Sequence, residues 1–251
     1  MQKFFEYQLV DDISMVALCV PQSDSVKPCG TQSATMVVNC LNPHSFVSAL
    51  DDEVFHNALL DSDYLLPDGE GICMTLKMFR GVVLHKIAGD DLHKLILEEL
   101  SKKGGRIFYM GSSSDVLSLI ESRLAKEHPS IKVRTHSPTY CDELSEDESM
   151  QIIAEINDFR PDVLFVSMTA PKQEKWLYKY RGQLQGVKMA ASIGGVFEFY
   201  AGTLKRAPKW AIKMHIEWLV RLIKEPQRMW KRNFVSTPKF LHWVWKHRKE
   251  C

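Results

Sequence analysis

Residues 187–195 read VKMAASIGG, a short apolar run that ends in a pair of glycines. Three earlier runs have the same character, namely ATMVVNCL at 34–41, RIFYMG at 106–111 and DVLFVSM at 162–168. The segments between them carry apolar residues at the spacing of amphipathic helices. Continuously apolar strands that alternate with such helices are typical of a parallel sheet covered by helices on both faces. The sequence therefore predicts an α/β fold of this kind.

The loops that follow the predicted strands are rich in glycine, proline and polar residues. They are NPH at 42–44, PDGEG at 67–71, GSSS at 111–114, TAPKQE at 169–174 and the pair Gly194-Gly195. In an open α/β sheet these loops gather at the carboxyl edge, which is where ligands bind. We therefore expect the functional site at that edge.

The chain divides by charge near residue 205. Residues 205–251 hold thirteen Lys and Arg against three Asp and Glu, a net charge of +10, and five of the six tryptophans. The residues before them carry 19 basic and 28 acidic side chains, or −9. Basic residues mixed with tryptophan are typical of a helix at an anionic membrane, although a solvated helix with core aromatics has a similar composition. We expect an α/β core over 1–204, with 1–33 as an N-terminal extension, and a basic, Trp-rich helical appendage over 205–251.

The composition limits which cellular compartment and which cofactors we expect for this protein. No run among the 251 residues is long enough to span a membrane, and the N-terminus lacks the pattern of a signal peptide. The six cysteines form no CxxC pair, which predicts reduced thiols, and the nine histidines form no HxxxH or Cys/His cluster. We expect a cytoplasmic protein, attached to a membrane surface at most, without a transition metal.

Two loops carry candidate site residues. PDGEG places Asp68 in a tight turn, and although Pro-Asp-Gly is a common turn for backbone reasons alone, its position after a strand favours a catalytic carboxylate. In TAPKQE, Pro171 marks a helix start. Lys172 and Gln173 would then lie beside free helix N–H groups, a setting that suits a phosphate or a base edge as well as an ordinary helix start.

Two further patterns are weaker. The loop after RIFYM begins at Gly111 and lacks the later glycines of GxGxxG and the Lys-Ser/Thr of a P-loop, so it predicts at most a small-residue loop near a nucleotide. Asp61 and Asp63 match the Asp-x-Asp pair by which many sugar-nucleotide enzymes hold a divalent cation. Because three-residue matches are frequent by chance, a turn after a helix is the favoured interpretation.

The appendage carries spaced arginines. Arg206 belongs to an RAP turn that opens a long helix, and Arg221, Arg228 and Arg232 follow in and after its last turn. Pro226 should break that helix, because proline lacks the backbone donor. The glycine pair, the RAP turn and these arginines together indicate an anionic ligand between the sheet edge and a basic helix.

Taken in order, PDGEG, KIAGDDL, APKQE, GGVFEFYAGTLKRAPKW and IEWLVRLIKEPQR resemble the motifs of the WecG/TagA/CpsF family of bacterial glycosyltransferases over about residues 34–232. The resemblance implies a Rossmann-like core and a basic appendage at the inner face of the cytoplasmic membrane. It implies inverting transfer of N-acetylmannosamine, its uronic acid or a related hexose from a UDP-sugar to a polyprenyl-diphosphate-linked glycan, in exopolysaccharide, capsule or cell-wall synthesis. No metal or other cofactor and no nucleic acid is implied, and the oligomeric state stays open.

By position, Asp68 resembles the family's catalytic aspartate and Asn42 the asparagine of its early Thr-x-Asn motif. Gln173 resembles the glutamine of its Pro-Lys-Gln-Glu motif, near the sugar nucleotide. Arg206, Arg221 and Arg228 match arginines that would meet diphosphate. Departures occur around the donor pocket, where Cys40 replaces a threonine, Lys86 an arginine, Glu198 an aspartate and Thr169-Ala170 a glycine, which puts the identity of the donor sugar in question. The expected substrate-binding residues are Cys40, Asn42, Lys86, Gly111, Lys172, Gln173, Gly194, Gly195, Glu198, Arg206, Arg221, Arg228 and Arg232.

The chemistry is consistent with these residues. Inverting transfer needs one base to deprotonate the acceptor hydroxyl, and Asp68 is the expected base. It also needs positive charge where the diphosphate leaves, which arginines supply. Two alternatives remain open at this point: a cation-dependent glycosyltransferase that uses Asp61 and Asp63, and a module that binds nucleotide-sugars or polyanions without turnover.

Overall fold

The structure is a computed structural model that describes residues 1–17, 35–204, 217–224 and 226–249. Its centre is an eight-stranded sheet in the order β1-β2-β4-β3-β8-β7-β5-β6. All pairs are parallel except β1 with β2. The strands are β1 (Gln2–Phe4), β2 (Tyr7–Leu9), β3 (Met36–Leu41), β4 (Tyr64–Pro67), β5 (Gly105–Gly111), β6 (Ile131–His136), β7 (Val163–Ser167) and β8 (Met189–Ser192).

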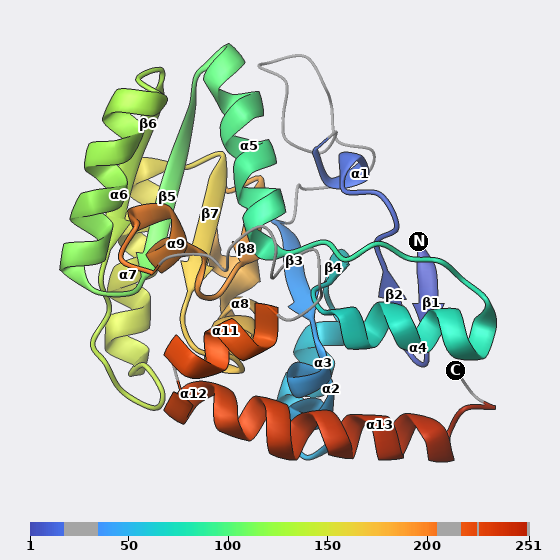
Figure 1. Ribbon diagram of the computed structural model, residues 1–251. Helices are drawn as coiled ribbons and strands as arrows, with labels where there is room; N and C mark the ends of the chain where they lie inside the picture. Colours follow the sequence, from blue (N-terminus) through green and yellow to red (C-terminus); the bar gives the residue numbers. More distant parts are fainter. Residues whose placement is uncertain (18–34, 205–216, 225, 250–251) are drawn as a thin grey trace.

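Helices cover both faces of this sheet (Figure 1). The α-helices are α1 (Ser14–Ala17), α2 (Pro43–Leu50), α3 (Glu53–Leu60), α4 (Glu70–Arg80), α5 (Gly89–Lys103), α6 (Ser114–Glu127), α7 (Glu146–Phe159), α8 (Lys172–Tyr180), α9 (Val196–Ala201), α11 (Glu217–Lys224), α12 (Pro226–Trp230) and α13 (Thr237–Lys246). A 3₁₀ turn, η1 (Arg181–Gln183), and a π-helical segment, η2 (Lys231–Ser236), complete the described elements. The predicted α/β architecture with a mostly parallel sheet is confirmed.

Three apolar clusters hold the layers together. On one face, α5, α6 and α9 pack against the central strands through residues such as Ile96, Ile120 and Phe197. On the other face, α7 and α8 pack through residues such as Ile156 and Leu177. The third cluster joins β1, β2 and β4 to α2, α4 and α13. The strands between the two main layers are buried on both sides, which explains their continuously apolar sequences.

The N-terminal residues belong to the sheet. β1 pairs with β2, and β2 extends the parallel sheet beside β4. Phe4 and Leu9 are fully buried. The first nine residues of the N-terminal extension expected over 1–33 thus add two strands to the sheet, and their alternate side chains complete the third cluster. Residues 18–34 lie outside the described residues.

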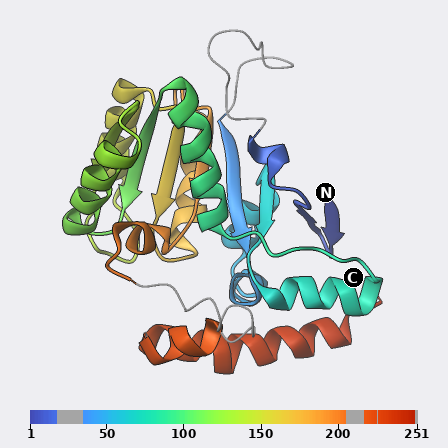
Figure 2. The ribbon, with the colours of Figure 1, turned by 45° about the horizontal axis from the view of Figure 1, so that its top comes forward.

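Between Glu217 and Lys246 the described residues of the C-terminal segment are helical. α11 ends at Lys224 and α12 begins at Pro226, with one undescribed residue between them. α13 then runs along the lower side of the molecule in Figures 1 and 2, with Phe240 and Val244 buried in the third cluster. In the part of the chain that the structure describes, no helix has the length and apolar character that a bilayer span requires. Residues 205–216, which include the RAP turn, lie outside this description.

Candidate active site

A crevice is expected where neighbouring strands send their chains to opposite faces of the sheet. The neighbours β3 and β8 meet this condition. β3 leads into α2 and α3, and α3 contacts α8 on one face, whereas β8 leads into α9 on the other face. Asn42 follows β3 and the pair Gly194-Gly195 follows β8. The topology thus brings these predicted site residues to one point of the carboxyl edge.

Asp68 lies directly beside the Asn42 loop. In the β3–β4 pair Leu41 is opposite Pro67, and the Asp68 N–H donates to the Leu41 carbonyl at 2.9 Å. The next residue, Gly69, has a φ of 153°, and a Cβ there would lie 3.1 Å from Cδ of Pro43. Glycine therefore allows the two loops to touch, and Asp68 lies partly exposed beside the Asn42 loop.

Asn42 has a defined structural task as well. Its side-chain oxygen accepts the N–H groups of His44 and Ser45, both at 3.0 Å, which caps the start of α2. The cap is reciprocal, because the Ser45 hydroxyl accepts a hydrogen bond from the Asn42 N–H at 2.8 Å. The cap fixes the backbone that borders Asp68.

Three carboxylates surround the thiol of Cys40. Burial, followed by the negative charges of Asp68, Glu174 and Asp91, raises the pKa of Cys40 well above its usual value, and the Gly89 N–H works in the opposite direction. The causes of this shift indicate that the negative charges of the β4, α5 and α8 ends act on the thiol at the end of β3. Cys40 thus stays a neutral thiol.

Gln173 and Glu174 form a buried polar pair at the start of α8. The side-chain oxygen of Gln173 accepts the Met168 N–H at 3.1 Å, and its amide donates to Oε1 of Glu174 at 2.8 Å. Oε2 of Glu174 has no hydrogen-bond partner among the described residues. Burial raises the pKa of Glu174 to about 7. Glu174 was not predicted as a site residue, although it stands beside Gln173 in the TAPKQE motif.

Gly111, Ser112 and Glu198 form a second polar contact further along the same edge. Gly111 has a φ of 120°, and a Cβ there would lie only 2.1 Å from the Ser167 carbonyl, so glycine is required. The Ser112 hydroxyl donates to Oε1 of Glu198 at 2.8 Å. Oε2 of Glu198 is buried and finds no hydrogen-bond partner within the described chain. Buried oxygens of this kind are ready to accept ligand hydroxyls. Ser112 was not predicted, because only the folded loop brings it to Glu198.

The glycine pair lies between these two contacts. Gly194 has a φ of 57°, and a Cβ there would lie 4.0 Å from the amide nitrogen of Gln173. Its carbonyl accepts the hydroxyl of Ser167. Gly195 then begins α9, the helix that carries Glu198. The loop therefore links the Gln173 and Glu198 contacts.

The two predicted lysines are placed differently. Ile87 N–H donates to the Pro67 carbonyl at 3.0 Å, which places the neighbouring Lys86 beside the Asp68 loop. The amine of Lys172 instead donates to the Cys141 carbonyl on the loop after β6. In this structure Lys172 therefore joins α8 to that loop, and a ligand would have to compete for its amine.

Only one of the predicted tail arginines has a described side chain. His44 Nδ1 lies 2.7 Å from the Ser236 hydroxyl. Burial, then the charges of Arg232 and Lys231, lower the pKa of His44 to about 4. Arg232 thus lies near His44 at the start of α2, and His44 stands two positions after Asn42 in the sequence. Arg206 and the side chains of Arg221 and Arg228 lie outside the described residues.

The Asp-x-Asp pair lies at the opposite edge. The Arg181 guanidinium donates to Asp61 at 2.7 Å and to Asp63 at 2.8 Å, and also to the Thr35 carbonyl at 2.9 Å. Both aspartates precede β4, so they belong to the amino edge of the sheet. The favoured interpretation of a structural turn agrees with this ion pair.

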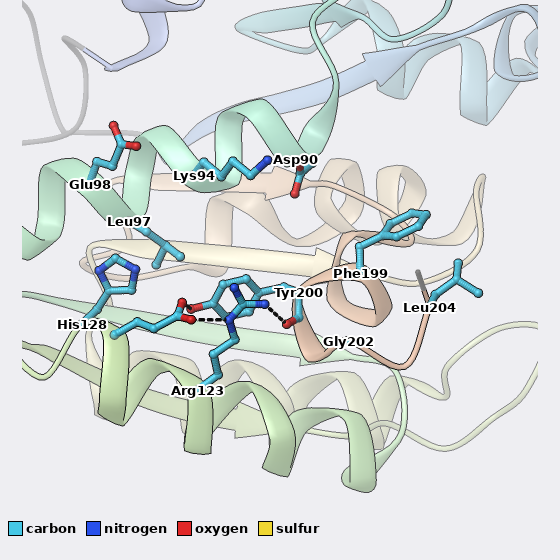
Figure 3. Close-up of a pocket in the computed structure, with 11 residues that line it drawn as sticks. Asp90, Lys94, Leu97, Glu98, Arg123, His128, Phe199, Tyr200, Gly202 and Leu204 are labelled. Atoms are coloured by element: carbon cyan, nitrogen blue, oxygen red, sulfur yellow. Dashed lines mark hydrogen bonds and ion pairs between the residues drawn. The ribbon is translucent and has the colours of Figure 1, made fainter. Parts of the chain in front are cut away.

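A cavity of about 450 Å³ lies elsewhere, between α5, α6 and α9 (Figure 3). Arg123 crosses it, donating to the Tyr200 carbonyl at 2.7 Å and to Glu127 at 2.8 Å. Its lining contains none of the predicted site residues within the described ranges, and Leu204 at its rim is the last residue before the undescribed stretch. Because Arg123 is paired with Glu127 and Lys94 with Asp90, and the lining lacks the predicted site residues, the carboxyl edge remains the candidate active site.

The chain is similar to known proteins over most of its length. The sequence model described as the Glycosyl transferase WecG/TagA/CpsF family matches residues 6–250, more than the stretch covered by the motifs. The chain is 34% identical over 218 residues to a Bacillus subtilis strain 168 protein, covering 87% of this chain and 82% of that protein. It is 32% identical to a Bacillus spizizenii W23 protein, covering 83% and 78%. It is 28% identical to a Staphylococcus aureus MW2 protein, covering 83% and 79%.

All three relatives carry the name N-acetylglucosaminyldiphosphoundecaprenol N-acetyl-beta-D-mannosaminyltransferase. The family match spans nearly the whole chain, and the first relative exceeds 30% identity over most of both proteins. The chain therefore belongs to the WecG/TagA/CpsF family of glycosyltransferases.

Proposed function

We propose that this enzyme transfers N-acetylmannosamine, or a closely related hexose or uronic acid, from a UDP-sugar to a polyprenyl-diphosphate-linked sugar, with inversion. The observation that carries the proposal is the placement of Asp68, a partly exposed carboxyl held against the Asn42 loop beside the β3–β8 crevice. The names of the relatives support this choice of donor sugar and acceptor.

In this proposal Asp68 is the general base. An acceptor hydroxyl hydrogen-bonded to its carboxylate loses a proton as the oxygen attacks the anomeric carbon of the donor. The C–O bond to UDP breaks on the opposite face of the sugar, which inverts the anomeric configuration. The Asn42 cap and the Gly69 turn hold the base in place, so little motion is needed to reach the reactive geometry.

The donor would lie along the edge from Gln173 to Glu198. The Gln173 amide and the unpaired oxygens of Glu174 and Glu198 offer hydrogen-bonding partners for the hydroxyls and amides of a sugar nucleotide. The departure from the family's aspartate to Glu198 places a longer side chain there. We therefore expect the choice of sugar to depend on Glu198 more than the reaction type does.

The leaving UDP needs positive charge to balance its second phosphate. Arg232 near the start of α2 supports a role of the C-terminal segment at the site. Arg206, Arg221 and Arg228 are proposed to meet diphosphate on the same side. Guanidinium groups suit this task because they form paired, planar hydrogen bonds and stay protonated.

We also propose that the enzyme works at the inner face of the cytoplasmic membrane, held there by its basic appendage. The net charge of +10 over residues 205–251 supports attraction to anionic lipid. A polyprenyl-diphosphate acceptor would be met at that surface.

Metal-dependent transfer through Asp61 and Asp63 is not favoured, because Arg181 occupies both carboxylates at the wrong edge of the sheet. We therefore propose a reaction that needs no metal ion. Turnover should continue in the presence of EDTA, measured as UDP release. Loss of turnover in EDTA, restored by added magnesium, would revive the metal-dependent alternative.

The decisive test is product formation. The full-length enzyme is incubated with UDP-N-acetylmannosamine and a short-chain, water-soluble lipid-diphosphate N-acetylglucosamine, and the disaccharide product is followed by mass spectrometry. UDP-N-acetylglucosamine and UDP-N-acetylmannosaminuronic acid serve as competing donors. We expect product with a mannosamine-type donor. Binding of UDP-sugars without any product would instead identify a non-catalytic nucleotide-sugar module.

A further inference from the structure

Helix α4 exposes two large apolar side chains that the core does not use. Met74 and Met78 are 58% and 68% exposed and lie one helical turn apart. The opposite side of the same helix is buried through Ile72 and Leu76. Single exposed apolar residues are common, whereas this pair on one helical face forms a small exposed apolar patch.

The C-terminal helices carry a longer exposed stripe. Trp230, Phe234, Leu241 and Trp245 are all exposed, and they follow one another at intervals of four or seven residues. Leu241 and Trp245 lie one turn apart on α13, which places them on one side of that helix. The rings of Trp230 and Phe234 lie 4.4 Å apart across the start of the π-helical segment, so these two side chains also share a side.

A basic side accompanies this stripe. Lys239 and Lys246 are exposed on α13. Between residues 226 and 249 the sequence has seven Lys and Arg and no Asp or Glu. The α12–α13 segment thus has a buried side, exposed apolar side chains and basic residues. This is the pattern of a helix that lies in a membrane interface.

α4 and α13 are neighbours. Phe240 of α13 lies against Gly71 of α4, where an added Cβ would be 3.7 Å from its ring, and both helices contribute to the same apolar cluster. Figures 1 and 2 show them side by side at one end of the molecule. Asp68 stands two residues before α4 begins. Any surface that contacts both helices would therefore lie close to the proposed base.

We propose that α4 of the catalytic core and the α12–α13 segment form one face that inserts into the headgroup region of an anionic bilayer, with Met74 and Met78 as the core's own contact. The inference deepens the proposed function, because a lipid-linked acceptor would then reach Asp68 at headgroup level. A second copy of this chain would fit less well, because two faces with this excess of positive charge repel each other. Anionic lipid matches both the apolar stripe and the charge.

The test compares two variants of the full-length chain. Met74→Asp with Met78→Asp alters the proposed face, whereas Met150→Asp alters a residue on α7 that is also exposed, at 45%. Binding is measured by sedimentation with phosphatidylcholine vesicles that contain or lack phosphatidylglycerol. Circular dichroism and the melting temperature confirm that both variants are folded, and light scattering reports the oligomeric state.

The double variant should bind anionic vesicles about tenfold more weakly, because two inserting side chains become charged, while the control variant binds like wild type. Its turnover on the short-chain soluble acceptor should be unchanged. Unchanged vesicle binding in a folded double variant would overturn the inference. So would a change of oligomeric state without a change in vesicle binding, which would identify the face as a contact between copies. Vesicle binding that depends on the methionines, in a protein without turnover, would uphold this face and refute the proposed function.

Discussion

At the amino edge of the sheet, Arg181 joins Asp61 and Asp63, and Asp162 accepts the Arg106 N–H and pairs with Lys188 at 2.9 Å. At the carboxyl edge, carboxyl groups of the same chemistry are left incompletely paired. Oε2 of Glu174 and Oε2 of Glu198 are both buried without a hydrogen-bond partner among the described residues. Polar groups whose hydrogen bonds and ion pairs are all made within the chain stabilise a fold. Buried polar atoms without such a partner are available to bind a ligand. The comparison suggests that charge pairing, more than residue type, separates scaffold from site.

The largest expected effect is on turnover at the carboxyl edge. Asp68→Asn should lower kcat by about two to four orders of magnitude, because the amide cannot accept the acceptor's proton. Asp61→Asn with Asp63→Asn should leave kcat within a factor of a few of wild type. UDP release measures both, and isothermal titration checks that Asp68→Asn still binds the UDP-sugar. Near-normal turnover in Asp68→Asn would remove the assignment and make Glu198 the next candidate base.

At the amino edge the expected effect is on stability. Arg181→Met removes the partner of two carboxylates and of the Thr35 carbonyl, and should lower the free energy of unfolding by about 2–3 kcal/mol. For a chain of this size the melting temperature should fall by about 5–10 °C, measured by calorimetry. Arg181→Lys should recover part of the loss. A large fall in kcat of the folded Arg181→Met enzyme would show that the amino edge also contributes to turnover, which contradicts the assignment of stability to one edge and catalysis to the other.

Glu174→Gln should have a smaller effect on stability, with the opposite sign. The unfolded carboxyl ionises near its ordinary pKa of 4.5, whereas burial holds the folded pKa at about 7. Between these values the native state retains a proton that the unfolded state has lost, so wild-type stability falls as pH rises and levels off above 7. The glutamine variant lacks this loss and should be more stable by about 1–3 kcal/mol at pH 8.

Urea unfolding at pH 5 and pH 8 measures this difference, which should nearly vanish at the lower pH. Glu174→Leu, which cannot accept the Gln173 amide, separates charge from hydrogen bonding. An equal gain for Glu174→Gln at both pH values would show that ionisation is not the cause.

The smallest expected effect concerns the second contact of the carboxyl edge. Ser112→Ala leaves both oxygens of Glu198 without this partner and should raise the KM for the UDP-sugar by about two- to tenfold, with kcat unchanged. Ser118→Ala on the outer part of α6 is a matched control, since its hydroxyl donates only to the Ser114 carbonyl. A fall in kcat with an unchanged KM would place Ser112 in the chemical step instead of in donor binding.

Much of the scaffold was predictable because its signals are local. The buried strands β3, β5, β7 and β8 appear as continuous apolar runs, and the loops after them determine where the site lies. Asp68, Asn42 and Gln173 gather at that edge as expected. Their separation along the chain does not matter, because parallel strands bring their carboxyl ends together whatever the length of the crossover.

The remaining features depend on contacts between distant residues. Arg181 reaches back about 120 residues to Asp61, and no pattern near either residue indicates the pairing. β1 and β2 are three residues long and become strands only by joining β4. The buried state of Glu174 likewise requires the folded layers. Sequence periodicity identified the main helices and strands. The Arg181 ion pairs, the two short strands and the burial of Glu174 depend on packing between distant segments, which periodicity does not encode.

The third apolar cluster has a consequence for the order in which the enzyme is assembled. It joins Phe4 in the first strand to Phe240 in the last helix, with their rings 6.4 Å apart, and Phe46 touches both. A ribosome releases Phe4 and Phe46 well before Phe240, so during translation the aromatic rings of β1 and α2 stay uncovered until α13 emerges. A chaperone that holds apolar surface would find its binding site there, beside the Asn42 loop. The nascent enzyme thus completes this end of its catalytic edge only after α13 has been released.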